Sequence, residues 1–248
     1  MQIATKSDRM LVISDLHIGN PYSLAKRNLG GFLRYCREAG WDLCINGDGL
    51  EILQASFGVL ARDALDIMTG LQELVRAGRR VFYVIGNHDI ALEHLLQTSL
   101  ASAICPFLNV TSGESRVRVE HGHLYDPSFV KHPVLYETLT RLAGPVLDWY
   151  PDIYKAWTGY QKMKDRWTRK RARSDLEASV YYEAADRILR RGFDAVIFGH
   201  THAAEQVELL PGKVYVNSGN WLRGTSYVAI DHGRVYLASW KQDGPPEA

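Results

Sequence analysis

The sequence predicts an α/β fold that contains parallel sheet. Apolar, strand-like runs alternate with helix-like segments through the first half of the chain, as in sheets whose strands are joined by helices. Five strand-like runs are followed at once by a short motif rich in Asp, His, Asn and Gly. The last part of the chain is rich in expected strands separated by turn signals. With 248 residues the chain can bury one large core, and we expect a single domain over residues 1–248.

The first half consists of three expected strand-and-helix units in succession. The strands are short and apolar throughout, and they cover 10–14, 43–46 and 81–85. The helices have apolar residues at helical spacing, and they cover 24–38, 59–77 and about 90–102. Gly40 and Gly78 follow the first two helices, where a left-handed residue commonly ends a helix.

The pattern changes beyond Ser112. We expect a strand at 116–120, then a long stretch of mainly helical pattern, and then a strand at 195–198. The remaining expected strands cover 206–210, 214–217, 226–231 and 234–240. The pairs Pro211-Gly212 and His232-Gly233 are turn signals that predict hairpins between these strands.

Composition excludes several classes of protein. The formal net charge of +1 provides no overall attraction for nucleic acid, so such binding would need a local basic patch. The three cysteines (Cys36, Cys44 and Cys105) are not in metal-binding spacing, which favours buried thiols in a reducing compartment. No apolar run approaches the roughly 20 residues of a membrane span, and the first strand leaves no room for a signal peptide. We therefore expect a cytoplasmic protein.

Five polar motifs directly follow expected strands. They are Asp15-Leu16-His17, Gly47-Asp48-Gly49-Leu50-Glu51, Gly86-Asn87-His88-Asp89, His121-Gly122-His123 and Gly199-His200-Thr201-His202. Any one of them is weak evidence, because a lone Asp-x-His or a lone buried histidine is common without a metal. Five in order, each at a strand end, indicate side chains that converge on one edge of the fold.

Seven side chains in these motifs suit a pair of divalent cations. They are Asp15, His17, Asp48, Asn87, His121, His200 and His202. Carboxylate, imidazole and amide groups together favour Mn²⁺, with Fe or Zn²⁺ as alternatives. One carboxylate should bridge the two cations, which would hold a phosphate while a hydroxide between them attacks phosphorus. We expect His88 to stabilise the transferred phosphoryl group or to protonate the leaving oxygen, with Asp89 or another carboxylate fixing its tautomer.

The five motifs resemble those of the calcineurin-like metallophosphoesterase superfamily over residues 10–240. The resemblance implies a four-layered α/β/β/α sandwich with a dinuclear centre at the strand ends. One implied ligand set is Asp15, His17, Asp48 and His202, and the other is Asp48, Asn87, His121 and His200. His88 would be the catalytic histidine with Asp89 as its partner. Glu51 would support the ligands without binding metal, and His123 matches a histidine of some small phosphodiesterases, where it would also act in support.

The long gap before the last motif predicts a helical lid at about 126–175. His121 and His200 are 79 residues apart, whereas the earlier intervals are 33 to 39 residues. The lid and the segment 216–221 resemble the bacterial UDP-2,3-diacylglucosamine pyrophosphatases, although that group carries arginine at His88 and aspartate at His123. The candidate substrate-binding residues are Trp157, Lys164, Arg166 and Asn217.

The expected lid combines an aromatic stripe with a basic flank. Trp157, Tyr160 and Trp167 fall on one helical face, and eight basic residues and one acidic residue lie between Lys155 and Arg173. Three interpretations stay open: a solvated basic face, contact with anionic lipid, or a nucleic-acid groove, which the low net charge disfavours.

The leading expectation is hydrolysis of a phosphate ester or pyrophosphate, with a UDP-diacylglucosamine-like nucleotide-lipid as the foremost substrate. Such a substrate would bring the protein to the anionic inner face of the membrane. The alternatives are a phosphodiesterase or nuclease acting on nucleotides or DNA, and a non-catalytic scaffold that binds protein partners. The intact ligand set argues against the scaffold.

Overall fold

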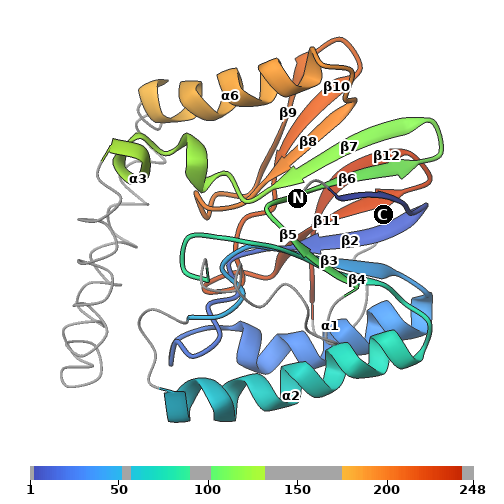
Figure 1. Ribbon diagram of the computed structural model, residues 1–248, viewed down its shortest axis with the longest axis vertical. Coiled ribbons are helices and arrows are strands. Elements are labelled where there is room, and N and C mark those ends of the chain that lie inside the picture. Colours follow the sequence, from blue (N-terminus) through green and yellow to red (C-terminus); the bar gives the residue numbers. More distant parts are fainter. Residues whose placement is uncertain (1–2, 52–56, 90–101, 132–174, 242–248) are drawn as a thin grey trace.

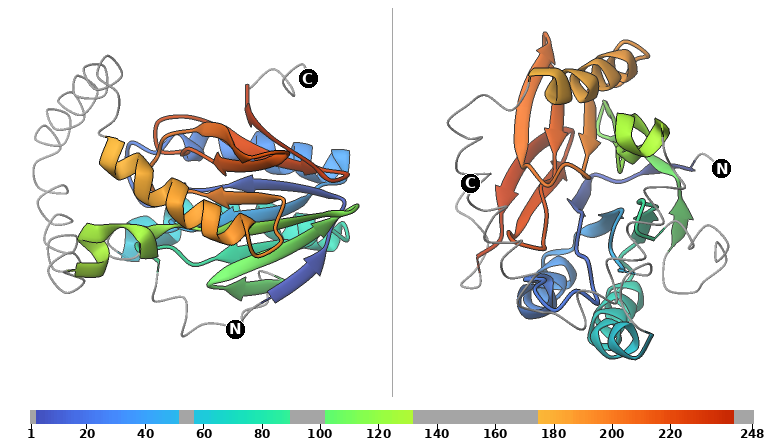
Figure 2. Two further views of the ribbon diagram at one scale, coloured as in Figure 1. Left: turned by 90° about the horizontal axis from the view of Figure 1, so that it is seen from above. Right: turned by 90° about the vertical axis from the view of Figure 1, so that its left-hand side faces the viewer.

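The computed structural model describes residues 3–51, 57–89, 102–131 and 175–241. Two six-stranded sheets pack face to face, with helices on the outer face of each (Figures 1 and 2). Helices α1 (Ala25–Ala39) and α2 (Phe57–Arg76) cover one sheet, and α6 (Asp175–Leu189) covers the other. This arrangement confirms the predicted α/β/β/α sandwich.

The first sheet, called here the β3 sheet, has the strand order β12-β11-β2-β3-β4-β5. Its bounds are β2 (Arg9–Ile13), β3 (Asp42–Asn46), β4 (Val81–Val84), β5 (Ala103–Cys105), β11 (Ser226–Asp231) and β12 (Arg234–Ser239). Strands β2 to β5 run parallel, so their C-terminal ends lie at one edge. Strands β11 and β12 form the predicted hairpin and join β2 antiparallel.

The second sheet, called the β8 sheet, has the strand order β1-β6-β7-β8-β10-β9. Its bounds are β1 (Ile3–Lys6), β6 (Phe107–Ser112), β7 (Ser115–Glu120), β8 (Ala195–Phe198), β9 (Glu205–Leu210) and β10 (Lys213–Asn217). Strands β7, β8 and β10 run parallel to one another. Their C-terminal ends therefore also share an edge.

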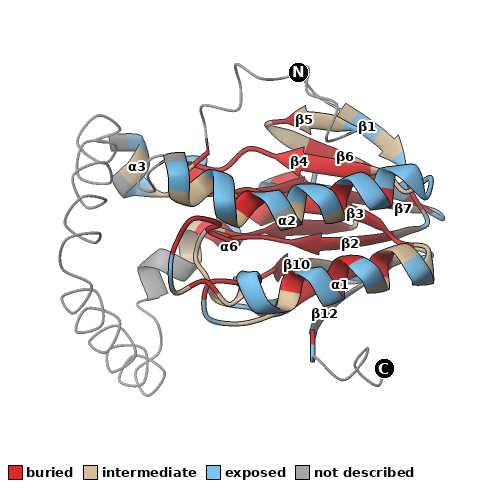
Figure 3. Cartoon of the chain, turned by 90° about the horizontal axis from the view of Figure 1, so that it is seen from below, coloured by how far each residue is buried: buried red, intermediate tan, exposed pale blue. Residues whose placement is uncertain are grey.

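Strand β2 shows why these strands are apolar throughout. Met10 and Val12 belong to the core between the two sheets, whereas Leu11 and Ile13 belong to the core between the β3 sheet and helix α1. A strand covered on both faces gains from apolar residues at every position. Figure 3 shows the result: strands β2, β3 and β4 are buried almost throughout, while α1 and α2 each keep an exposed face.

The helices follow the predicted pattern. The buried side chains of α1 recur at helical spacing; they are Ala25, Leu29, Phe32, Leu33 and Cys36. Gly40 has φ 75° and its backbone N–H reaches the carbonyl of Cys36, which ends α1 as predicted. Two short elements follow β7, namely the 3-10 turn η2 (His123–Tyr125) and helix α3 (Pro127–Lys131).

Three strands were not predicted: β1, β5 and β6. Each lies at or next to a sheet edge and has a mixed burial pattern instead of a continuous apolar run. Strand β1 pairs with β6, about a hundred residues away in the chain, with Ile3 opposite Leu108. Such pairing depends on a distant partner and leaves little local signal.

Part of the prediction lies outside the described residues. This holds for most of the expected helix at 90–102 and for most of the expected lid, including Trp157, Lys164 and Arg166. Within the lid bounds the structure describes α3 at one end and the first residue of α6 at the other. In the described part of the chain, no helix combines the length and apolar character that a membrane crossing requires.

Candidate metal centre

The five motifs lie in loops that follow parallel strands of the two sheets. Strands β2, β3 and β4 lead to Asp15, Asp48 and Asn87, and strands β7 and β8 lead to His121 and His200. Hydrogen bonds tie the two edges together. For example, Asn46 Nδ2 donates to the carbonyl of Glu120 at 2.9 Å, and the backbone N–H of His200 donates to Asp15 Oδ2 at 3.2 Å. The two strand edges thus form one site.

The backbone at the predicted ligands is unusual. Five of the seven have a left-handed conformation: Asp15 (φ 54°), His17 (46°), Asp48 (51°), His200 (64°) and His202 (59°). In the described chain, His232 is the one other non-glycine residue with positive φ. This conformation costs roughly 1 kcal/mol or more per residue and persists where the surroundings impose it. The paired side chains therefore converge through left-handed turns at the ends of the strands.

At two motif positions a neighbouring ligand side chain lies so close to the backbone that only glycine fits. A Cβ atom on Gly47 would lie 2.3 Å from Nδ1 of His121, and one on Gly86 would lie 2.2 Å from Oδ1 of Asp48. Any larger residue at either position would displace a predicted ligand. The glycines thus allow the ligand loops to pack against one another.

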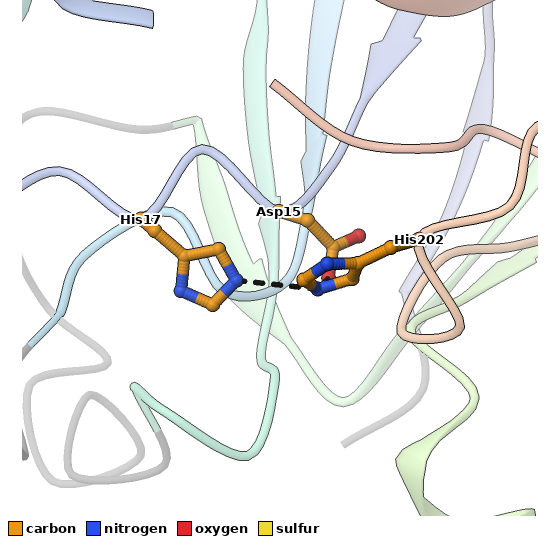
Figure 4. Close-up of side chains that lie close together, drawn as sticks. All are labelled: Asp15, His17 and His202. Atoms are coloured by element: carbon orange, nitrogen blue, oxygen red, sulfur yellow. Dashed lines mark hydrogen bonds and ion pairs between the residues drawn. The ribbon is translucent and has the colours of Figure 1, made fainter. Parts of the chain in front are cut away.

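Six of the seven predicted ligands fall into two triads. The first triad is Asp15, His17 and His202 (Figure 4), and the second triad is Asp48, His121 and His200. In each triad the candidate ligand atoms lie within 4.8 Å of one another. A third such group, formed by His17, Asp48 and His88, overlaps both. The seventh residue, Asn87, is buried in the loop after β4, beside His88.

The donor atoms fit divalent cations. Oδ1 of Asp15 and Nε2 of His121 are buried and have no hydrogen-bond partner. The nearest polar atom to Nε2 of His202 in the first triad is Oδ1 of Asp15, at 3.0 Å. In the second triad, Nε2 of His121 lies 3.3 Å from Oδ2 of Asp48. Buried donor atoms without a hydrogen-bond partner, such as Oδ1 of Asp15 and Nε2 of His121, are what Mn²⁺, Fe or Zn²⁺ would satisfy.

The electrostatic field of the site attracts positive charge. Although burial opposes protonation, the negative charge of Asp48 raises the pKa of His121 to about 10. Burial likewise opposes ionisation of Asp48, yet the positive charge of His121 holds the pKa of Asp48 well below its usual value. The same buried carboxylate charge would favour a divalent cation in place of those protons.

Glu51 is the partner of His88. Its Oε1 lies 2.5 Å from Nδ1 of His88, and its Oε2 lies 2.7 Å from Nδ1 of His17. Burial would raise the pKa of Glu51, but the hydrogen bonds from both histidines lower it to about 2. Burial also opposes protonation of His88, yet the charge of Asp48 and the bond to Glu51 raise its pKa to about 9. One carboxylate thus orients a candidate ligand and the candidate catalytic histidine.

The expectation that Asp89 fixes the tautomer of His88 is wrong. The carboxylate of Asp89 accepts hydrogen bonds from the backbone N–H groups of Gly86 (2.7 Å) and Gly49 (2.9 Å) and from the hydroxyl of Tyr83. It therefore joins the two ligand loops after β3 and β4, while Glu51 meets the ring of His88. Burial and the nearby charge of Asp48 raise the pKa of Asp89 to about 6.

Asn217, a candidate substrate-binding residue, is fully buried, and its side chain bonds to the surrounding loops. Its Nδ2 donates to the carbonyl of Gly199 at 2.8 Å and to the hydroxyl of Thr201 at 3.0 Å, and its Oδ1 accepts from the backbone of Gly219. The nearby Asn220 donates to the backbone carbonyl of His202 at 2.8 Å. Both asparagines hold the loop that carries the last two predicted ligands.

His123 lies beside the second triad, as its expected supporting role requires. Its ring centroid is 5.5 Å from that of His121 and 6.4 Å from that of His200, and it meets Phe129 edge to face at 5.1 Å. Burial and the two neighbouring imidazoles lower the pKa of His123 to about 3, which keeps the ring neutral.

Sequence reasoning missed two residues of the site. Tyr83 lies inside an apolar strand and bonds Asp89; its only local signal is a hydroxyl in a buried run. Asp126 places Oδ2 at 3.1 Å from Nε2 of His200, and nothing in the sequence near it points to that contact.

Comparison with protein families matches residues 9–204 to the family described as calcineurin-like phosphoesterase. Among curated proteins, no sequence matches this chain.

Several solved structures are similar to this one. A conserved protein of Streptococcus pneumoniae TIGR4, described as a predicted phosphoesterase, is 15% identical with a TM-score of 0.42; the match covers 96% of this chain and 91% of that one. Vacuolar Protein Sorting 29 from Cryptosporidium parvum is 16% identical with a TM-score of 0.45, over 93% and 95% of the two chains. Wild-type Vps29 from Entamoeba histolytica, complexed with Zn²⁺, is 15% identical with a TM-score of 0.43, over 94% and 99%.

Proposed function

The chain belongs to the calcineurin-like phosphoesterase family, and we propose that it is a divalent-metal-dependent hydrolase of a phosphate ester or pyrophosphate. The observation that carries the proposal is the overlap of the two triads with His88 and its partner Glu51 in one buried site. A metal-binding protein without catalysis would need the triads but would have no use for an oriented histidine beside them.

Asp48 is the candidate carboxylate shared between two cations. It belongs to the second triad and also to the group with His17 and His88, so one carboxylate lies within reach of both ligand groups. Two divalent cations, with Mn²⁺ as the metal of choice for an assay, would hold the phosphate oxygens and lower the pKa of the attacking water. The chain itself holds the ligand atoms rigidly, through the left-handed turns and the buried hydrogen bonds described above.

His88 is placed to act on the substrate directly. Glu51 accepts the hydrogen bond from Nδ1, which leaves Nε2 of His88 for the phosphate. The side chain of His88 is 14% exposed, so a ligand in the site can reach it. Nε2 would donate a hydrogen bond to a phosphoryl oxygen or a proton to the leaving oxygen.

The approach of the substrate is expected from the side of His202. The His202 side chain is 37% exposed, whereas those of Asp15, His121 and His200 are at most 9% exposed. The other ligands would thus be shielded from bulk water, which strengthens their electrostatic interactions with a bound phosphate.

For the substrate we propose a nucleotide-lipid pyrophosphate, as in UDP-diacylglucosamine. The support is the aromatic and basic sequence between Lys155 and Arg173, at the place where the resembled pyrophosphatases carry their lid. The second candidate is a phosphodiester of a nucleotide. The specific observation in its favour is His88, held by Glu51, at the position where those pyrophosphatases carry arginine.

A substrate panel tests the proposal. The purified full-length chain with Mn²⁺ would be assayed against UDP-diacylglucosamine, a cyclic nucleotide, single-stranded DNA and an aryl phosphodiester, with a chelator control. Metal-dependent hydrolysis of at least one phosphate substrate is expected. No hydrolysis of any of them by chain that has bound metal would reject the enzyme and revive the non-catalytic scaffold.

A separate binding experiment tests the lipid substrate. Lys164 and Arg166 would be replaced together by Ala, and Trp157 separately, and each variant would be tested for binding to vesicles that contain anionic lipid. Each lost basic residue should weaken binding by about 1 kcal/mol if the segment contacts such lipid. Unchanged binding would leave the phosphodiester as the better candidate.

A further inference from the structure

We propose that Asp126 is a positioning residue that selects which ring nitrogen of His200 is available to a cation bound by the second triad. The evidence is the contact of 3.1 Å between Oδ2 of Asp126 and Nε2 of His200. The inference rests on the proposed function only in that it needs a cation to bind the site. It does not depend on which substrate is hydrolysed.

Three imidazoles of the two triads, each with a side chain at most 9% exposed, share one arrangement. In each ring, one nitrogen is held by an oxygen atom outside the triads. Glu51 Oε2 holds Nδ1 of His17 at 2.7 Å, and the carbonyl of Asn46 holds Nδ1 of His121 at 2.8 Å. For His200 the roles of the nitrogens are reversed, because Asp126 holds Nε2. His17 and His121 thus keep Nε2 for a cation, whereas His200 keeps Nδ1.

The choice of nitrogen decides whether His200 can bind a cation at all. A neutral imidazole has one N–H group and one lone pair, and only the lone pair binds metal. A carboxylate acceptor fixes the N–H on Nε2 of His200, which places the lone pair on Nδ1. Loss of such a partner commonly lowers metal affinity about 10- to 100-fold.

Asp126 is held well enough to do this. Its backbone N–H donates to the carbonyl of His123 at 3.1 Å, and its own carbonyl accepts from Val130 at 3.0 Å, so the backbone is anchored on both sides. The side chains of Asp126 and His200 are only 24% and 9% exposed. The pair is therefore partly shielded from water, which makes the hydrogen bond stronger than a similar bond at the surface.

His202 provides an internal contrast within the first triad. Its recorded ring contacts in the described part of the chain involve Nε2, which lies 3.0 Å from Oδ1 of Asp15 and 3.4 Å from Nε2 of His17. Asn220 holds the backbone of His202 and not its ring. Loss of Asp126 should therefore weaken one cation site and leave the other unchanged.

Metal titration of three variants tests the role of Asp126. Asp126→Ser replaces the carboxylate by a hydroxyl on a side chain too short to keep the contact with Nε2 of His200, but keeps a small polar residue before α3. Asp126→Asn keeps an oxygen that can accept from His200. Asp186→Ala, which removes an exposed partner of Arg190 on α6, is the matched control. Metal-depleted full-length protein would be titrated with Mn²⁺ by calorimetry and by electron paramagnetic resonance, with unfolding in chelator as the folding control.

We expect Asp126→Ser to weaken one of two Mn²⁺ sites by about 10- to 100-fold, and Asp126→Asn to stay within about threefold of wild type. The control should match wild type. If Asp126→Ser bound both Mn²⁺ ions with wild-type affinity, the proposal would be overturned. It would also be overturned if Asp126→Asn bound Mn²⁺ as weakly as Asp126→Ser, because the negative charge of Asp126 and not its hydrogen bond to His200 would then be responsible. A wild-type chain that binds two cations but hydrolyses no substrate would reject the proposed function alone.

Discussion

The two edges of the candidate metal centre are held by different chemistry. At the edge of the β3 sheet, buried carboxylates do the holding: Glu51 accepts from His17 and His88, and Asp89 accepts from the backbone of both neighbouring ligand loops. At the edge of the β8 sheet, the neutral amide of Asn217 holds the backbone of the last ligand loop, and a single carboxylate, Asp126, meets the ring of His200. The first edge therefore combines positioning with negative charge, whereas Asn217 contributes position alone.

This difference follows from what each edge must supply. The β3 edge carries Asp15 and Asp48, whose charge makes the site attractive to cations, and additional carboxylates nearby strengthen the same field. The β8 edge contributes imidazoles, which bind metal only when neutral. Adding carboxylates around all of them would favour protonation of the rings in the absence of a cation. Replacing one hydrogen-bonding side chain at a time can separate the effect of positioning the ligands from the effect of negative charge in the site.

Asp48→Asn should have the largest effect, because it removes the carboxylate shared by two ligand groups. We expect hydrolysis of an aryl phosphodiester to fall by at least about 10³-fold and the Mn²⁺ content to fall with it, since an amide carries no charge and bridges poorly. Initial rates and elemental analysis measure the two effects. Asp186→Asn, an exposed change of the same chemistry, should alter neither. Full activity in Asp48→Asn would refute the shared carboxylate.

Asp89→Asn should have the next largest effect, and on stability. The new amide would turn its N–H₂ group toward donors that now bond the carboxylate, so the free energy of unfolding should fall by about 3 kcal/mol. Urea unfolding in the presence of chelator measures this without any contribution from metal. Tyr83→Phe, which removes one of the three donors, should cost about 1 kcal/mol. If the urea midpoint of Asp89→Asn equalled that of the wild type, the two ligand loops would pack together without help from the carboxylate.

Asn217→Ala should lower the free energy of unfolding by about 2 kcal/mol, because three hydrogen bonds are lost but no charge is removed or left unpaired. The same urea experiment gives a direct comparison with Asp89→Asn. If both variants lost the same free energy of unfolding, hydrogen bonding without charge would explain how the ligand loops are held at both edges. A larger loss at Asp89 would support the added part played by charge.

Glu51→Gln should have the smallest effect of the four. The amide oxygen can still accept from one histidine, so we expect kcat to fall about tenfold while two Mn²⁺ ions still bind. Steady-state kinetics with a parallel metal titration checks this, and Glu73→Gln on the exposed face of α2 is the control. A loss of metal equal to that of Asp48→Asn would show that Glu51 binds a cation itself.

The fold was largely predictable where strands are buried on both faces. Strands such as β2 and β3 are apolar at each position because both faces are covered, and the pattern is visible locally. Strand β1 was missed because it lies at a sheet edge and its pairing with β6 depends on residues about a hundred positions away. Edge strands carry less local signal because only part of their surface is buried.

The site divides in a similar way. The residues that face one another in the two triads were all named from motif spacing, since strand-end position and residue type are both local properties. The partners of those residues were not. Asp89 was expected to hold His88, and Asn217 to meet substrate, but each bonds backbone groups of other loops instead. Adjacency in sequence is a poor guide to which polar side chains meet.

The sequence by itself determined the α/β class and the set of donor atoms, because apolar runs encode strands and residue types encode the chemistry of ligands. The α/β/β/α sandwich was implied by the resemblance of the five motifs to a known family. Only the tertiary structure decided which side chain forms a hydrogen bond with which ligand. Glu51 meets His17 from 34 positions away, and Asp126 meets His200 from 74 positions away. The left-handed turns that aim Asp15 and the other ligands likewise exist because packing imposes them. Contacts of that kind depend on how two sheets come together, and no local pattern records them.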